Sequence, residues 1–187
     1  MIREWEKLEY YDPERILSCL RDIALTLPLD TLPYSEASLR KRNLRQYGES
    51  RQCALFCYGI SKAFNIKISY AHYERSDYDF VAVRVDDDNL YYTPIQMKEL
   101  VPENVNSKVS LEQELEKLKK YSNSKDLVVA IHLNRAGKIN INELTIPELN
   151  ISELWFFGAA DETQEKWHLI GNILRNPQYY EFQYPKN

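Results

Sequence analysis

Residues 74–99 read ERSDYDFVAVRVDDDNLYYTPIQMKE, and they carry the clearest structural pattern in the chain. Within it, residues 80–85 alternate between two sets of side chains, which is typical of a β-strand. The run Asp86-Asp87-Asp88-Asn89 consists of turn-forming residues, and residues 90–97 then return as a second strand. We therefore predict an antiparallel hairpin over residues 79–97.

The segments before the hairpin are predicted to be mainly helical. Residues 13–27 have apolar side chains at helical spacing, with Asp12 placed as the N-cap and Pro28 beyond the end. Residues 36–46 favour a basic helix, and residues 49–64 favour a stronger one. Alternation at residues 66–70 then indicates a strand.

The segments after the hairpin alternate between helix and strand. Ser110, with Gln113 three residues later, predicts a capping box at the start of a helix over residues 110–121. Residues 127–133 are almost wholly apolar, which is typical of a strand buried on both faces. A further strand is predicted at 154–158 and a helix at 162–174. This order predicts an α/β fold with a mixed β-sheet, in which a central hairpin is flanked by helices.

The composition of the chain indicates a globular protein and argues against several other classes of protein. The chain has 187 residues, 44% of them hydrophobic and 28% charged, which is typical of one globular domain. No apolar run reaches the ~20 residues needed to cross a bilayer. The N-terminus has no apolar signal core, so we expect a cytoplasmic protein without membrane contact. Only 5 Gly are present, with no Gly-rich phosphate loop, which argues against a nucleotide-dependent enzyme.

Charge is unevenly distributed along the chain. The net charge of −4 argues against general polyanion binding. Residues 40–51, here called the basic segment, nevertheless contain five cations against Glu49 alone: Arg40, Lys41, Arg42, Arg45 and Arg51. The basic segment is either a phosphate-binding surface or a solvated helix face.

Three polar residues are expected to converge at the hairpin. Asp79 opens the first strand, while Gln96 and Lys98 lie two apart on the second and so project from the same face. A carboxylate and an amide oxygen suit Mg²⁺, which prefers oxygen ligands and keeps several waters. The ammonium of Lys98 could orient or deprotonate water, or stabilise charge on a phosphate. Asp77 or Glu74 could replace Asp79, but the apolar run from residue 80 favours Asp79.

These residues resemble the motif of the PD-(D/E)XK nucleases. In that family an acidic residue opens a strand, a hairpin follows, and an acidic residue, one spacer and a lysine end it. Asp79-Phe80 matches the first half, with Tyr78 in place of proline, and Gln96-Met97-Lys98 matches the second, with glutamine in place of the carboxylate. The later helix and buried strand also match, and Glu49 occupies the place of a further family glutamate.

The resemblance implies a restriction-endonuclease-like core at residues 49–135, between a helical extension at 1–35 and a strand and helix at 136–187. It also implies a metal-dependent nuclease that hydrolyses DNA, with Mg²⁺ or Mn²⁺ held by Asp79 and Gln96. Catalysis would involve these two residues with Lys98 and Glu49. Since two strands need two sites, it favours a homodimer. The alternative is a catalytically inactive, nuclease-like binding or regulatory protein.

Other reactive side chains are expected to be structural. Cys53 and Cys57 lie four apart on a predicted helix, and no second cysteine pair completes a zinc site, so we expect buried thiols. His132 lies inside an apolar strand and is expected to be a core residue with its hydrogen bonds satisfied.

Overall fold

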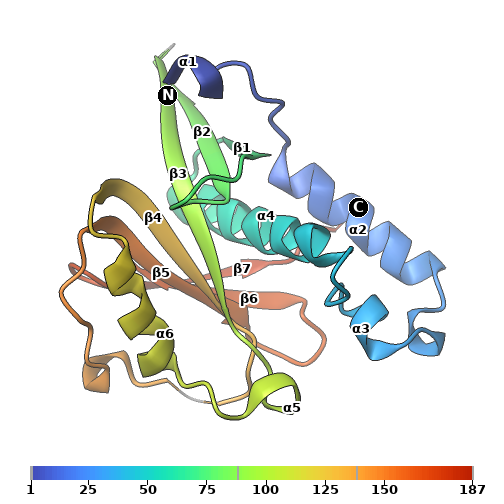
Figure 1. The fold of residues 1–187 in the computed structure, drawn as a ribbon. Helices are drawn as coiled ribbons and strands as arrows, with labels where there is room; N and C mark the ends of the chain where they lie inside the picture. The colour runs from blue at the N-terminus through green and yellow to red at the C-terminus, as the bar shows by residue number, and fades with distance from the viewer. Residues whose placement is uncertain (1, 88, 138, 187) are drawn as a thin grey trace.

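A computed structural model of the chain describes residues 2–87, 89–137 and 139–186 (Figure 1). One seven-stranded mixed sheet organises these residues, with its strands side by side in chain order. The strands are β1 Ile68–His72, β2 Phe80–Asp86, β3 Asn89–Leu100, β4 Ser124–Leu133, β5 Ile151–Ala159, β6 Lys166–Gly171 and β7 Gln178–Gln183. Strands β3, β4 and β5 run parallel, and all other neighbours are antiparallel.

Helices lie before the sheet and between β3 and β4. They are α1 Ile2–Trp5, α2 Pro13–Thr26, α3 Tyr34–Ala37, α4 Arg45–Phe64, α5 Glu103–Asn106 and α6 Leu111–Lys117. Short 3₁₀ turns occur at Leu29–Thr31, Leu118–Lys120 and Ile141–Glu143. Figure 1 shows the sheet curled, with the long helix α4 lying across it. None of the helices in the described ranges is both long and apolar enough to span a membrane.

The predicted hairpin is confirmed. Phe80 of β2 lies opposite Ile95 of β3, and the pairing continues to Asp86 opposite Asn89. Asp88, in the predicted turn, lies outside the described residues. β4 flanks the hairpin as predicted, pairing in parallel with β3, and its side chains from residue 127 to 132 are all buried.

Local capping signals also behave as predicted. The side chain of Asp12 accepts hydrogen bonds from the backbone N–H groups of Glu14 (2.9 Å) and Arg15 (3.2 Å), with Pro13 in the first helical turn. The Ser110 hydroxyl accepts from the Gln113 N–H while the Gln113 side chain accepts from the Ser110 N–H, which is the predicted capping box.

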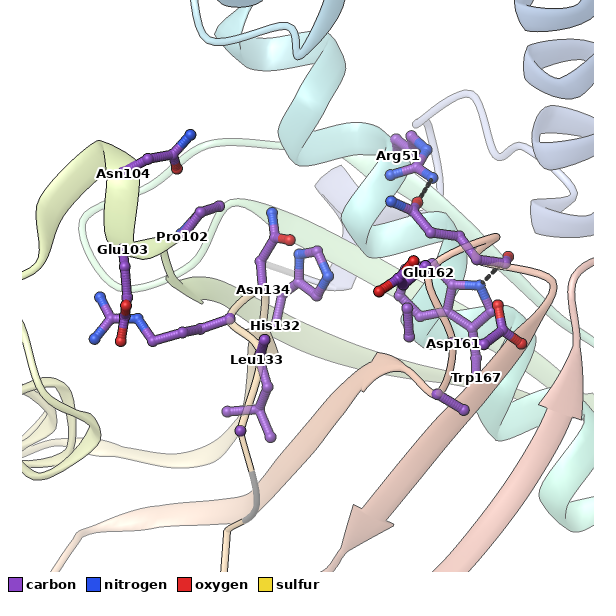
Figure 2. Close-up of a pocket in the computed structure, with 16 residues that line it drawn as sticks. Arg51, Pro102, Glu103, Asn104, His132, Leu133, Asn134, Asp161, Glu162 and Trp167 are labelled. Atoms are coloured by element: carbon purple, nitrogen blue, oxygen red, sulfur yellow. Dashed lines mark hydrogen bonds between the residues drawn. The ribbon is translucent and has the colours of Figure 1, made fainter.

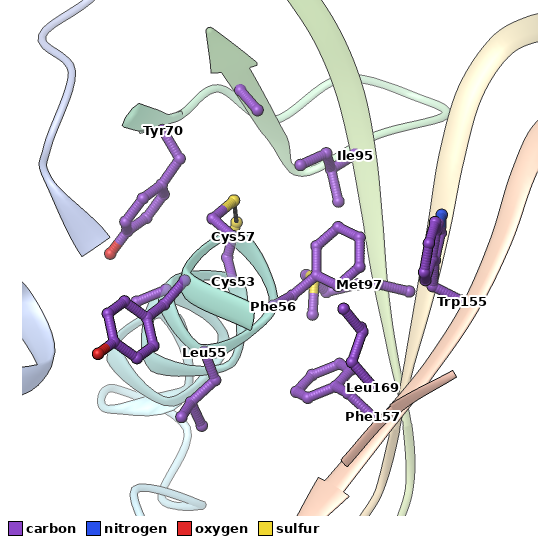
Figure 3. Packing of buried hydrophobic residues seen from close by; sticks show 14 of the residues in the cluster. Cys53, Leu55, Phe56, Cys57, Tyr70, Ile95, Met97, Trp155, Phe157 and Leu169 are labelled. Atoms are coloured by element: carbon purple, nitrogen blue, oxygen red, sulfur yellow. Dashed lines mark hydrogen bonds between the residues drawn. The ribbon is translucent and has the colours of Figure 1, made fainter. Parts of the chain in front are cut away.

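Two apolar clusters occupy the two faces of the sheet. On one face, Phe56 of α4 packs against Phe157 of β5 with their ring centroids 6.0 Å apart (Figure 3). On the other, Leu115 of α6 belongs to a cluster with Val129 and Phe156. Because successive strand residues point to opposite faces, β5 contributes one phenylalanine to each cluster.

Buried thiols are confirmed at Cys53 and Cys57, which lie in the α4 cluster (Figure 3). Their sulfur atoms are 4.0 Å apart across one helical turn. Cys19 is exposed on α2.

The predicted basic helix over residues 36–46 is wrong. α3 ends at Ala37, Leu39 adopts a left-handed φ of 57°, and α4 begins only at Arg45. Arg40 leaves the helical path and binds Glu99 on β3 through two hydrogen bonds, at 2.5 and 3.2 Å. A pairing this distant in sequence outweighs local helix propensity.

The predicted C-terminal helix over residues 162–174 is also wrong. The segment forms β6, which pairs with β5 and with β7, so residues 136–187 contribute three strands rather than a strand and a helix. Trp167, Leu169 and Gly171 are buried while the side chains between them are only partly buried, which is the two-residue period of a strand.

His132 is a core residue, but its hydrogen bonds are not fully satisfied. Its ring is 4% exposed and stacks on Phe157 at 5.0 Å between centroids. Its Nδ1 atom has no hydrogen-bond partner among the described residues. Burial lowers the pKa of His132 from 6.5 to about 4, with Arg51 and Arg40 opposing protonation and Glu99 favouring it.

This burial predicts a pH-dependent stability. The unfolded chain binds the His132 proton near its ordinary pKa of about 6.5, whereas the folded chain binds it only near 4. The free energy of unfolding is therefore unaffected by His132 protonation above about pH 6.5, and it falls as the pH drops from 6.5 toward 4. Between about pH 7 and pH 5 we expect His132 to remove about 2 kcal/mol from the free energy of unfolding.

Urea unfolding of the wild type and His132→Phe at both pH values tests this expectation. The variant keeps an aromatic ring in the stack and should lose about 2 kcal/mol less on acidification than the wild type. Equal losses in the two proteins would show that His132 is not the group responsible.

Candidate active site

Hydrogen bonds of the backbone place Asp79 where the chain enters β2. The Asp79 N–H donates to the Ile95 carbonyl on β3 at 3.0 Å, and the Asp79 carbonyl accepts from the Tyr73 N–H at 3.0 Å. Gln96 and Lys98 then follow Ile95 on β3, two residues apart. The hairpin therefore brings together the three residues predicted from the sequence.

Gln96 links two other side chains in this site. Its Nε2 donates to Oδ2 of Asp79, and its Oε1 accepts from the Tyr121 hydroxyl at 2.9 Å. Gln96 is 4% exposed and Tyr121 is 2% exposed, so both lie in the protein interior. Tyr121 ends the predicted helix over residues 110–121 and was not predicted as a site residue, because no sequence pattern marks it.

The charges of the site are partly removed from water. Burial raises the pKa of Asp79, while the charge of Lys98 lowers it and that of Glu49 raises it. Burial lowers the pKa of Lys98, and the charge of Lys120 lowers it further. Asp79 and Lys98 thus carry opposite charges that attract one another without forming a close ion pair, and both are partly buried. Such shifted pKa values are found at functional sites more often than elsewhere.

Glu49 approaches the site from the second turn of α4. Its charge is close enough to affect the pKa values of both Asp79 and Lys98. Its carboxylate accepts a hydrogen bond from Nε of Arg45 at 2.8 Å, one turn earlier on the helix. Glu49 therefore acts on Asp79 through charge, with Arg45 as its direct partner.

The other two acidic candidates act on this cluster through charge: Glu74 raises the pKa of Asp79, and Asp77 raises the pKa of Tyr121. Asp77 accepts a hydrogen bond from the Ser124 hydroxyl at 2.8 Å. Glu74 is exposed. Asp79 is the acidic residue that contacts Gln96.

The donor atoms do not form a zinc site, and the Gln96 amide directs its Nε2 rather than its oxygen at Asp79. No group of three or more His, Cys, Asp or Glu side chains suited to a metal is found within the described ranges. Zinc sites require three or four such ligands. Magnesium is commonly held by one or two carboxylates and keeps several waters, which one carboxylate beside an amide could provide.

Most cations of the basic segment are bound to neighbouring side chains. Arg40 binds Glu99, and Lys41 binds Glu36 at 2.7 Å. Arg45 binds Glu49, and Arg51 donates a hydrogen bond to Gln164 at 3.1 Å. Arg42 is exposed. These are the five cations of the basic segment: Arg40, Lys41, Arg42, Arg45 and Arg51. These pairings reduce the positive charge that the segment offers to a ligand.

A cavity of about 680 Å³ lies at the carboxyl ends of the parallel strands (Figure 2). His132 and Asn134 at the end of β4 face Arg51 and Trp167 across it. Its described lining does not include Asp79 or the residues grouped with it. The candidate active site and this cavity are therefore separate features.

The candidate site is thus a half-buried cluster of Asp79, Gln96 and Lys98, with Tyr121 behind it and Glu49 nearby. Comparison of the chain with models of protein families, with curated proteins and with solved structures finds no match.

Proposed function

We propose that this chain is a Mg²⁺- or Mn²⁺-dependent nuclease that hydrolyses DNA, with a restriction-endonuclease-like core. The observation that carries the proposal is the contact of Asp79 with Gln96 on the adjoining strand, with the charge of Lys98 near enough to act on Asp79. The element order also supports it. Helix α4 precedes the antiparallel strands β1–β3, and α6 then leads to β4, which is parallel to β3. This order agrees with the PD-(D/E)XK core that the sequence resembles.

Asp79 and Gln96 would hold the metal ion in this proposal. A bound ion supplies positive charge that polarises the phosphodiester and lowers the pKa of water. Lys98 would orient the attacking water or stabilise negative charge on the phosphate. The partial burial of Lys98 suits the role of orienting the attacking water, because burial lowers its pKa and so increases the fraction of neutral amine.

Tyr121 can hydrogen-bond to the Gln96 amide in both the metal-free and the metal-bound site. In the structure, Nε2 faces Asp79 and Oε1 faces the Tyr121 hydroxyl. To present its oxygen beside Asp79, the amide must turn over, which brings Nε2 to Tyr121. A hydroxyl both donates and accepts, so Tyr121 can satisfy the buried amide in both orientations.

The second candidate function is a non-catalytic binding or regulatory protein with a nuclease-like sheet. The contact that favours it is the Gln96 Nε2 donating to Asp79, which satisfies the carboxylate without a metal. Calorimetric titration with Mg²⁺ or Mn²⁺ separates the two candidates. A nuclease site should bind the ion, whereas heats no larger than those of Asp79→Asn would favour the binding protein.

Gln96→Glu is expected to tighten Mg²⁺ binding roughly tenfold, because it adds a second carboxylate beside Asp79. Calorimetry on the wild type and the variant measures the change. Gln183→Glu, on the exposed side of edge strand β7, makes the same charge change as a control and should leave affinity unaltered. Equal affinity in all three proteins would remove Gln96 from the metal site.

DNA is the proposed partner, and a homodimer is the proposed assembly because cleavage of a duplex requires one site for each strand. Sedimentation of the metal-free protein with a short duplex tests the assembly. We expect two chains per duplex, and one chain per duplex would contradict the dimer.

A further inference from the structure

Two ammonium groups lie beside the ring of Tyr121. Nζ of Lys98 is 6.0 Å from the ring centroid, and Nζ of Lys120 is 4.9 Å from it. Lys98 comes from β3, and Lys120 from the 3₁₀ turn that ends just before Tyr121. The Tyr121 ring therefore lies within cation–π range of one ammonium group from each of these two elements.

These two lysines differ from their neighbours in their ionic contacts. Lys117 binds Glu114 and Lys119 binds Glu116, each at 2.6 Å. Across the described ranges, neither Lys98 nor Lys120 has an acidic partner within 4.0 Å. Asp79, Glu114 and Glu49 attract Lys98 only at longer range.

The two like charges are close enough to repel each other. Both ammonium groups lie within 6.0 Å of the same ring centroid, which places two positive charges around one side chain. Two nearby cations that form no close ion pair are stabilised by a bound anion. A phosphate group carries the charge and the acceptor oxygens that two ammonium groups would bind.

We propose that Lys120 is a second phosphate-binding residue of the candidate site and that, together with Lys98, it binds a phosphate of a nucleic-acid strand next to Asp79. This inference rests on the proposed function and extends it. It also moves the main phosphate contact away from the basic segment, whose arginines are largely bound to Glu99, Glu49 and Gln164.

The test compares Lys120→Gln with Lys119→Gln in the metal-free protein. Both lysines are exposed and both substitutions remove one positive charge, but only Lys119 is bound to a glutamate. Binding of a fluorescent DNA duplex in EDTA is followed by anisotropy at several salt concentrations. We expect Lys120→Gln to weaken binding roughly tenfold and to reduce the salt dependence by about one phosphate contact. Lys119→Gln should change affinity less than about twofold.

Several outcomes would overturn the inference. Equal losses in the two variants would indicate general charge attraction, and unchanged or undetectable DNA binding would remove the phosphate site. A parallel binding experiment uses pyrophosphate in place of DNA, to test whether the site binds a small phosphate compound. If pyrophosphate binds through Lys120 while DNA does not, the ligand is a small phosphate compound and the strand assignment is wrong.

The same variants distinguish failure of the nuclease proposal from failure of the Lys120 proposal. If DNA binds through Lys120 in EDTA but is not cleaved on addition of Mg²⁺ or Mn²⁺, the phosphate site stands and the nuclease does not. If cleavage occurs with the same kcat/KM in Lys120→Gln as in the wild type, the nuclease stands and the role of Lys120 is wrong.

Discussion

Asp79→Asn should abolish metal-dependent DNA cleavage, with a loss of roughly 100- to 1000-fold or more in kcat/KM. Asp79 is the acidic residue that contacts Gln96, and it lies within the electric field of Lys98. Loss of a carboxylate that holds a catalytic metal removes several kcal/mol of transition-state stabilisation. Cleavage of a labelled duplex with Mg²⁺ or Mn²⁺, with an EDTA blank, measures the change.

Asp77→Asn is the matched control for this experiment. It makes the same chemical change two residues earlier, on a side chain that accepts a hydrogen bond from Ser124. We expect this control to retain cleavage. Loss of activity in Asp77→Asn with retention in Asp79→Asn would assign the metal to Asp77 instead. A wild type inactive with both metals would favour the non-catalytic binding protein.

Stability separates a chemical effect of Asp79→Asn from unfolding. The variant removes a half-buried charge that is already costly, since burial raises the pKa of Asp79. Asparagine can still accept a hydrogen bond from Gln96. The free energy of unfolding of the metal-free variant should therefore remain within about 1 kcal/mol of the wild type. A larger loss in urea unfolding would make the activity result uninformative about the metal.

Phe157→Ala is expected to lower the free energy of unfolding by about 3–5 kcal/mol. Phe157 has no exposed surface and packs against Phe56, with His132 stacked on its ring. Removing it leaves a cavity under α4 in the centre of the sheet. Because natural domains have only about 5–15 kcal/mol of stability, this change should bring the protein close to unfolding.

Urea unfolding followed by tryptophan fluorescence tests the prediction for Phe157. Leu25→Ala is the control, because Leu25 is 79% exposed at the end of α2 and should cost less than about 0.5 kcal/mol. Similar small effects in both variants would mean that Phe157 does not lie in the closely packed core.

The hairpin, the helix caps and the shared face of Gln96 and Lys98 could all be predicted from the amino-acid sequence. Each depends on residues close together in the chain. The turn residues before Asn89 direct β3 back along β2, and the two-residue period of a strand places residues 96 and 98 on one side. Asp12 and Ser110 bond to backbone groups at most three residues away. Such short-range preferences survive in almost any fold.

The contacts around those residues could not be predicted, because they depend on how distant segments pack. Tyr121 reaches Gln96 across 25 positions, and Arg40 reaches Glu99 across 59, so neither contact has a local signal. The Arg40 pairing takes residues 38–44 out of the predicted helix. β6 became a strand because it fills the open edge of β5, whose backbone N–H and C=O groups would otherwise be unpaired. The partners of a side chain depend on which distant segments fold against it, and the spacing of residues along the chain does not contain that information.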